Sequence, residues 1–75
     1  MREIDRMAVG ELLKKHRQER GIKVSDLRQL FGYGTDVPIL RWEDGISLPS
    51  VDHLDALAEL YGTTLDDLII YKQGG

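Results

Sequence analysis

The chain contains no cysteine in its 75 residues, which excludes both a disulfide framework and a metal site built from thiolates. It also has no apolar run near the length of about 20 residues that crosses a bilayer as a helix. The N-terminal residues lack the apolar stretch of a secretory signal peptide. These absences together predict a cytoplasmic protein that does not enter a membrane.

Residue patterns typical of catalysis are also missing. The sequence has no glycine-rich phosphate loop, and its two histidines, His16 and His53, lack further ligands at the spacing that a metal site needs. Asp66 and Asp67 are adjacent, but they stand where a helix is expected to begin, and acidic side chains favour that end of the helix dipole. We therefore expect no enzymatic activity, no metal site and no cofactor.

The charge is modest in total and uneven along the chain. A net charge of −3 argues mildly against a nucleic-acid partner, because nucleic-acid-binding domains are often basic. Residues 1–30, however, carry eight basic and five acidic side chains, whereas residues 31–75 carry two basic and eight acidic ones. This division predicts a polar molecule with a basic face, although the same charges also fit ordinary solvated helix surfaces.

Apolar residues recur at helical spacing throughout the chain, and no segment alternates as a strand would. Helices are expected at about residues 5–20, 24–31, 36–44, 50–61 and 65–71. Glycine follows four of these segments, at the position where a helix commonly ends in a left-handed residue. The sequence predicts an all-α, compact five-helix bundle that forms one domain over residues 1–75, with its core within about 7–70.

Hydroxyl side chains mark where the later helices begin. Thr35 and Thr64 each precede an expected helix and can accept a backbone N–H there as N-caps, and Ser50 is the first residue of the expected fourth helix. The inward faces of the second and fourth helices follow from the apolar spacing. We expect these faces to consist of Val24, Leu27, Leu30 and Phe31, and of Val51, Leu54, Leu57, Ala58 and Tyr61.

The stretch from Val24 to Ser50 carries the most information about function. It comprises two short amphipathic segments joined by a turn that contains Gly32 and Gly34. Two helices of about two turns each with such a connection describe a helix-turn-helix, here over about residues 24–44. The second helix of this motif usually enters the major groove of DNA, so the pattern favours DNA binding.

A series of short motifs runs through the chain: Gly10-Glu-Leu-Leu, Arg20-Gly21, Leu30-Phe31-Gly32, Ile39-Leu-Arg-Trp-Glu-Asp-Gly45, Leu48-Pro49-Ser50, Tyr61-Gly62 and Leu65-Asp-Asp-Leu68. Through these motifs the chain resembles, over about residues 7–70, the helix-turn-helix domains of phage repressors, Cro proteins and small bacterial regulators, the XRE-type family. The resemblance implies a lambda-repressor-like fold of five helices in which the third is the recognition helix. It also implies an ion pair between Arg17 and Glu43 that fixes the third helix against the first.

The same resemblance implies which side chains contact DNA. Arg41 would pair with guanine and Asp36 would accept a hydrogen bond from cytosine, while apolar side chains would contact thymine methyl groups. The candidates for base contacts are Thr35, Asp36, Val37, Leu40 and Arg41. The candidates for phosphate contacts are Lys23, Val24, Arg28 and Tyr33.

Several positions depart from the pattern of this family. Lys23 and Val24 stand where members often have Ser or Thr followed by Gln, and Asp36 opens a recognition helix that is usually polar or basic. Asp44 precedes the closing glycine, where Asn is common. Residues 33–47 carry one basic and three acidic side chains, a net charge of −2. We therefore expect weak DNA binding, strong dependence on salt, or a need for dimerisation.

The leading hypothesis is a sequence-specific DNA-binding transcriptional regulator, a repressor that acts as a homodimer on a roughly palindromic site. Two recognition helices about one turn of DNA apart would then read two half-sites. The dimer surface is expected either on the fifth helix, through Ile70 and Tyr71, or on exposed parts of the fourth helix.

A protein-interaction module, antitoxin-like or a co-regulator, is the alternative, because a fold does not determine its function. Such a module would bind its protein partner through the apolar and acidic surface of Val37, Leu40, Asp36 and Asp44. The two hypotheses differ in whether Arg41→Ala or Val37→Asp is the damaging substitution.

Overall fold

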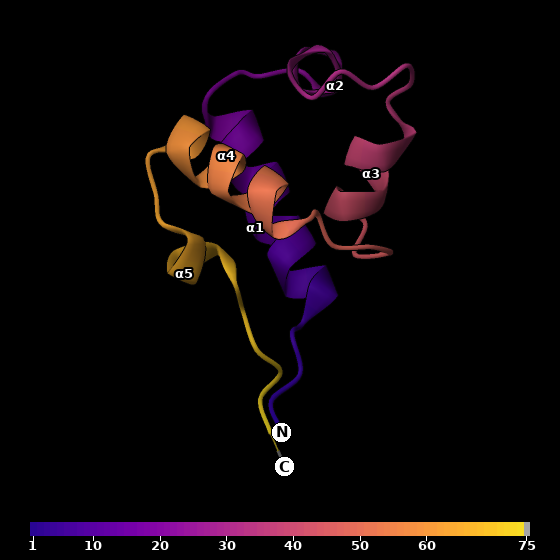
Figure 1. Ribbon diagram of the computed structural model, residues 1–75. Helices are drawn as coiled ribbons and strands as arrows, with labels where there is room; N and C mark the ends of the chain where they lie inside the picture. Colours follow the sequence, from indigo (N-terminus) through magenta and orange to yellow (C-terminus); the bar gives the residue numbers. More distant parts are fainter. Residues whose placement is uncertain (75) are drawn as a thin grey trace.

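Five helices form the structure, a computed structural model that describes residues 1–74. They are α1 (Arg6–Glu19), α2 (Val24–Leu30), α3 (Val37–Glu43), α4 (Val51–Tyr61) and α5 (Leu65–Leu68), arranged as shown in Figure 1. The all-α prediction with five helices is therefore confirmed. None of the helices within residues 1–74 is long and apolar enough to cross a membrane.

Side-chain caps explain where three of the helices begin. The carboxylate of Asp5 accepts a hydrogen bond from the backbone N–H of Ala8 at 3.0 Å, at the start of α1. The hydroxyl groups of Ser50 and Thr64 accept in the same way at the starts of α4 and α5, at 3.2 and 3.1 Å. Each cap satisfies a backbone donor that the helix itself leaves unpaired.

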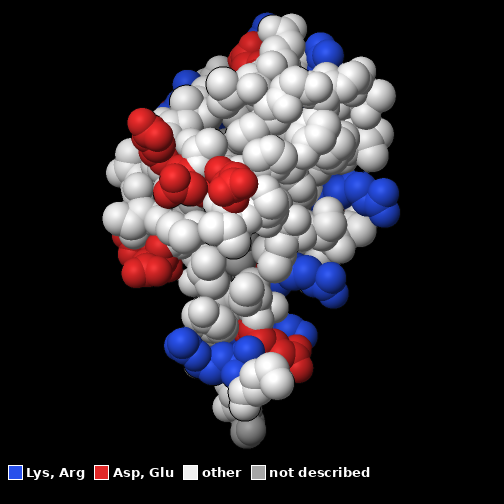
Figure 2. All heavy atoms as spheres, in the orientation of Figure 1, with Lys and Arg blue, Asp and Glu red and all other residues white. Residues whose placement is uncertain are grey.

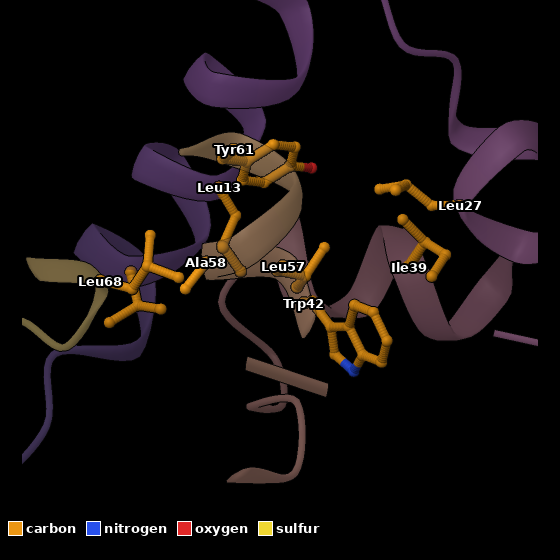
Figure 3. Close-up of a cluster of buried hydrophobic side chains, with 9 residues drawn as sticks. Leu13, Leu27, Ile39, Trp42, Leu57, Ala58, Tyr61 and Leu68 are labelled. Atoms are coloured by element: carbon orange, nitrogen blue, oxygen red, sulfur yellow. The ribbon is translucent and has the colours of Figure 1, made fainter. Parts of the chain in front are cut away.

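The hydrophobic core receives side chains from all five helices (Figure 3). Its buried members are Val9, Leu13, Leu27, Ile39, Trp42, Leu57, Ala58, Tyr61 and Leu68. Burial of each large apolar side chain contributes about 1.5–3 kcal/mol to folding. Leu54, Leu57, Ala58 and Tyr61 form the inward face of α4, as the sequence predicts.

Two residues expected in the core lie on the surface instead. Leu30 is 60% exposed and Val51 is 66% exposed, so both predictions are wrong. Each stands at an end of its helix: Leu30 is the last residue of α2, and Val51 is the first residue of α4. The helical spacing of apolar residues therefore continues to the helix ends, where the side chains of these two residues are largely exposed.

The C-terminal segment differs from its expected helical form. Helix α5 ends at Leu68 rather than near Tyr71, and the chain then runs extended beside the N-terminal residues (Figure 1). Ile4 and Tyr71 form an antiparallel bridge, and the N–H of Asp5 donates to the carbonyl oxygen of Ile70 at 2.7 Å. Adjacent β-branched side chains, such as those at positions 69–70, favour extended backbone. The helical dimer surface expected at Ile70 and Tyr71 is therefore absent.

Candidate nucleic-acid interface

The turn between α2 and α3 holds the two helices of the motif in place. Gly32 has a φ of +73°, a left-handed conformation that glycine adopts at little cost. The N–H of Tyr33 donates to the carbonyl oxygen of Arg28 at 2.9 Å, which closes the end of α2. Asp36, rather than the predicted Thr35, is the N-cap residue of α3. The hydroxyl of Thr35 instead accepts weakly, at 3.4 Å, from the N–H two residues later.

Helix α3 has one buried face and one exposed face. Ile39 and Trp42 are buried in the core. Val37 and Leu40 are 52% and 45% exposed, and Arg41 is also exposed. The structure therefore places the predicted base-contact residues of this helix together on its outward face.

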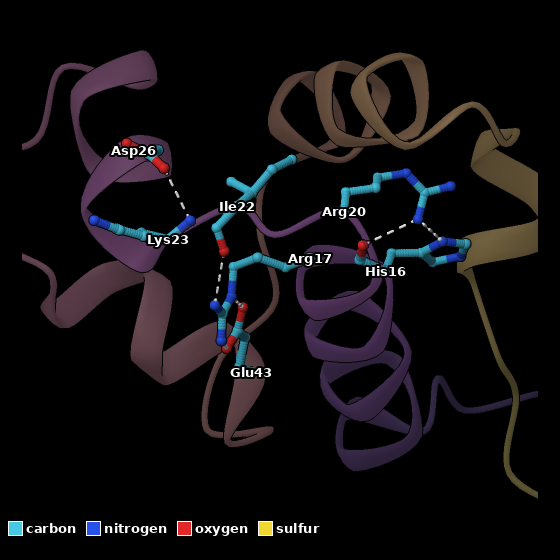
Figure 4. Close-up of polar contacts among 7 residues, drawn as sticks. All are labelled: His16, Arg17, Arg20, Ile22, Lys23, Asp26 and Glu43. Carbon is cyan, nitrogen blue, oxygen red and sulfur yellow. Dashed lines mark hydrogen bonds and ion pairs between the residues drawn. The ribbon is translucent and has the colours of Figure 1, made fainter.

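A bidentate ion pair ties α3 to α1 (Figure 4). Arg17 Nε donates to Glu43 Oε2 at 2.6 Å and Nη2 donates to Oε1 at 2.9 Å. Arg17 Nη1 donates to the carbonyl oxygen of Ile22 at 3.0 Å. This hydrogen bond also connects the segment between α1 and α2 to the ion pair. The hydrogen bonds to Glu43 raise the pKa of Arg17 and outweigh its burial, which lowers the pKa. The pair that the resemblance implies is thus present and joins three segments.

Tyr33 is half-buried and packs against other aromatic rings of the motif. Its ring meets Trp42 edge-on, with ring centroids 6.0 Å apart, and its hydroxyl lies 3.3 Å from Nδ1 of His53. The rings of Phe31 and Trp42 also surround His53, at centroid distances of 4.7 and 5.5 Å. The structure therefore gives Tyr33 a packing role, and the phosphate contact expected for it stays a prediction. No spacing pattern in the sequence links Tyr33 to His53.

The other predicted phosphate contacts are only partly available. The backbone N–H of Lys23 donates to Asp26 Oδ2 at 2.9 Å, although its side chain is exposed. Val24 packs against the core. Arg28 Nε lies 3.0 Å from Asp36 Oδ1. The residue predicted to contact phosphate therefore forms an ion pair with a residue predicted to contact a base.

Charged side chains are unevenly distributed over the face shown in Figure 2. In this view acidic side chains gather over α4 and α5, basic ones lie along the edge near α3, and both kinds lie together around the paired termini. The exposed acidic residues of α4 and α5 are Asp52, Asp55, Glu59, Asp66 and Asp67. A polyanion would therefore approach the α3 edge more readily than the α4–α5 surface.

Comparisons with known proteins agree with this architecture. Residues 8–69 match the profile of the family described as "Helix-turn-helix domain". Two structures of the BldD DNA-binding domain, one of them from S. venezulae, are similar to the chain with TM-scores of 0.69 and 0.70. Both are 21% identical and cover 88% of this chain, and the alignments cover 97% and 94% of those chains.

A further similarity is to one part of a longer protein. The structure of apo-HppE aligns with a TM-score of 0.71 and 26% identity over 88% of this chain, but over 36% of that chain. No curated protein sequence matches the chain. The structural similarities confirm the predicted fold.

Proposed function

Because the chain belongs to the helix-turn-helix domain family, we propose that it binds double-stranded DNA as a sequence-specific transcriptional regulator. The observation that carries this proposal is the placement of α3. Arg17 and Glu43 fix this helix from the inside, while Val37, Leu40 and Arg41 stand exposed on its outer face. A fixed helix with an open face meets the geometric requirement for docking in a major groove.

The outward side chains suit particular base contacts. Arg41 has no ion-pair partner within residues 1–74, so its guanidinium is free to donate two hydrogen bonds to guanine. Val37 and Leu40 offer methyl groups to thymine. Thr35 and Asp36 precede the helix, and Asp36 retains Oδ2 as an acceptor for the cytosine amino group.

The acidic composition of residues 33–47 is less unfavourable than its net charge of −2 implies. Glu43 is paired with Arg17, and Asp36 is paired with Arg28. Both arginines lie outside this segment and each compensates one carboxylate. Of the four charges in this segment, only those of Asp44 and Arg41 are then left without an ion-pair partner within residues 1–74, and they cancel in sum. The surface presented to phosphate is therefore close to neutral.

The finer parts of the proposal concern assembly and role. We propose that the chain forms one domain, because all five helices contribute side chains to a single core. We also propose that it acts in the cytoplasm as a repressor and has no catalytic activity. A homodimer would place two copies of α3 on the half-sites of a palindrome. The phosphate contacts proposed at the start of α2 are Lys23 and the backbone of Val24, and Arg28 joins them when phosphate competes with Asp36 for it.

A protein-interaction module is the second candidate function, and the exposure of Val37 and Leu40 favours it. Apolar side chains that are about half exposed on one helix face also suit a protein partner. In that case Val37→Asp would abolish partner binding, whereas Arg41→Ala would leave it unchanged.

The test is a titration of labelled DNA fragments from the region upstream of the gene, at low and at physiological salt, with competitor DNA present. The proposal expects saturable binding that survives competitor and is lost in Arg41→Ala. Lys15→Ala serves as the matched control, since Lys15 is exposed on α1 away from the core-facing side. Binding that is equal on all fragments and equally weak in both variants would contradict sequence-specific recognition and favour a protein partner.

A further inference from the structure

We propose that Arg6 and Arg2 form a second phosphate-binding surface, which contacts the DNA backbone beside the base pairs that α3 reads. This inference rests on the proposed function and deepens it. The connection after α3 has no basic residue that could contact phosphate, since it contains Asp44, Ile46 and Ser47. The two arginines would supply this basic charge from the N-terminal segment instead.

Arg6 lies on the side of α1 that faces α3. It stands four residues before Gly10, and residues four apart share one face of a helix. A Cβ atom added to Gly10 would lie 2.5 Å from the carbonyl oxygen of Trp42, so this face of α1 touches the last turn of α3. Arg6 is one turn nearer the N-terminus and is exposed.

The next contact places Arg6 beside the corner where α3 ends. Gly45 has a φ of +74°, and a Cβ atom added there would lie 2.7 Å from Cα of Met7. The residue that follows Arg6 therefore packs directly against the turn after α3. In a helix-turn-helix complex, backbone contacts on either side of the recognition helix position that helix in the groove. Arg6 is placed to supply such a contact.

The acidic neighbours of these two arginines are already occupied. Asp5 caps α1 by accepting a hydrogen bond from the N–H of Ala8. Glu3 pairs with Lys72 at 3.2 Å. Within residues 1–74 Arg6 has no ion-pair partner, and the guanidinium of Arg2 lies over the ring of Tyr71, 4.1 Å from its centroid. Neither Arg2 nor Arg6 is therefore held in an ion pair within residues 1–74, and both guanidinium groups are available to a phosphate.

The C-terminal residues hold this segment in a fixed extended conformation. Besides the Ile4–Tyr71 bridge, the N–H of Lys72 donates to the carbonyl oxygen of Glu3 at 2.8 Å. Figure 2 shows basic side chains around these paired termini, with acidic ones beside them. A segment that is ordered before binding loses less conformational entropy on contact with DNA than a free arm does.

The experiment compares the salt dependence of DNA binding in the wild type, Arg6→Gln, Arg2→Gln and Lys15→Gln. Lys15 is the matched control because it loses the same charge on the opposite side of α1 from Arg6. Each phosphate contact contributes about 0.9 to the slope of log K against log salt concentration. We expect Arg6→Gln to reduce the slope by about 1 and to weaken specific and non-specific fragments equally, with a smaller loss in Arg2→Gln.

Two further measurements separate the possible failures. Arg6→Lys retains the charge and should restore the slope, and thermal melting should show that Arg6→Gln remains folded. A slope for Arg6→Gln equal to that of Lys15→Gln, in a protein that still needs Arg41 for specific binding, would overturn this inference alone. Absence of specific binding by the wild type would instead overturn the proposed function, and this contact with it.

Discussion

Arg28 on α2 and Asp36 at the start of α3 form an ion pair across the turn of the motif, with Nε and Oδ1 3.0 Å apart. Their side chains are 29% and 46% exposed, so water screens the pair, and its contribution to stability is at most about 1 kcal/mol. Its main consequence is electrostatic. It neutralises the carboxylate at the start of α3 and occupies an arginine that the proposed function places against a phosphate.

The substitution Asp36→Asn should therefore have two opposite effects on DNA binding. It releases Arg28 for a phosphate, which should steepen the salt dependence by about 1 and strengthen binding to any sequence. It also replaces the charged acceptor for cytosine with an amide, whose oxygen still accepts but whose NH2 group can donate to other bases, so discrimination at one base pair should fall by no more than about 3 kcal/mol. Fluorescence anisotropy on matched and single-mismatch duplexes measures both effects. Asp44→Asn is the control, and specificity lost equally in both variants would contradict the assignment.

Breaking the pair between Arg17 and Glu43 should be far more damaging to stability. Glu43→Gln leaves the guanidinium of Arg17 partly buried without its charge partner, a loss of about 3–5 kcal/mol. That loss approaches the whole stability of a chain this short. Glu3→Gln breaks the exposed pair with Lys72 and should cost less than about 1 kcal/mol. Urea unfolding compares the two, and similar midpoints would show that the buried pair is not needed.

The fold could be predicted from the sequence because its signals are local. Ser50 and Thr64 cap the helices they precede, and Gly62 ends α4 in the left-handed conformation, as local chemistry requires. The wrong predictions concern residues whose burial or backbone conformation depends on contacts with distant parts of the chain. Leu30 has the right spacing for the core but no covering element, and the extended residues after Leu68 depend on pairing with the N-terminal segment.

The candidate site could be predicted only in part. The pair between Arg17 and Glu43 was implied by the family resemblance, and it agrees with the compensation that a carboxylate beside the buried Trp42 requires. The Arg28–Asp36 pair was not, since its formation depends on the conformation of the turn between them. The same holds for the contact of Tyr33 with His53, because the two residues come from different elements that only the folded core brings together.

Tyr61 should make the protein sensitive to alkaline pH. Its hydroxyl is buried without a hydrogen-bond partner within the described residues, and burial, followed by the charge of Glu43, raises the pKa of Tyr61 to about 12. The unfolded chain would lose this proton near pH 10 and the folded chain only near pH 12. The free energy of unfolding should therefore fall as pH rises between these values, and be unaffected by this group below pH 10.

The substitution Tyr61→Phe tests that assignment. It removes both the ionisable group and the unpaired hydroxyl, so stability near pH 7 should be unchanged or higher by about 1 kcal/mol. The loss of stability between pH 10 and about 12 should become smaller. Thermal melting across this range provides the measurement, with Tyr71→Phe as the control because Tyr71 is exposed. An identical pH profile in Tyr61→Phe and the wild type would assign the alkaline sensitivity to another group.

Gly10→Ala should test how closely α1 and α3 approach. Alanine ordinarily stabilises the interior of a helix by about 0.5–1 kcal/mol relative to glycine. At this position, however, the added Cβ would lie 2.5 and 2.6 Å from the carbonyl oxygens of Trp42 and Glu43. These atoms belong to the backbone of α3, so the whole helix must move to relieve the overlap. We expect a net loss of about 1–3 kcal/mol, as in other overpacked cores.

The matched control is Gly34→Ala, because nothing lies within 4 Å of a Cβ atom added there and the residue does not require a positive φ. Its melting temperature should stay near that of the wild type, while Gly10→Ala should melt about 4–8 °C lower for each kcal/mol lost. Displacement of α3 should also weaken specific DNA binding more than non-specific binding, because base contacts require exact placement and phosphate contacts do not. Equal melting temperatures for the two variants would mean that α1 and α3 have room to separate, and that the packing at Gly10 does not help the Arg17–Glu43 pair to fix α3.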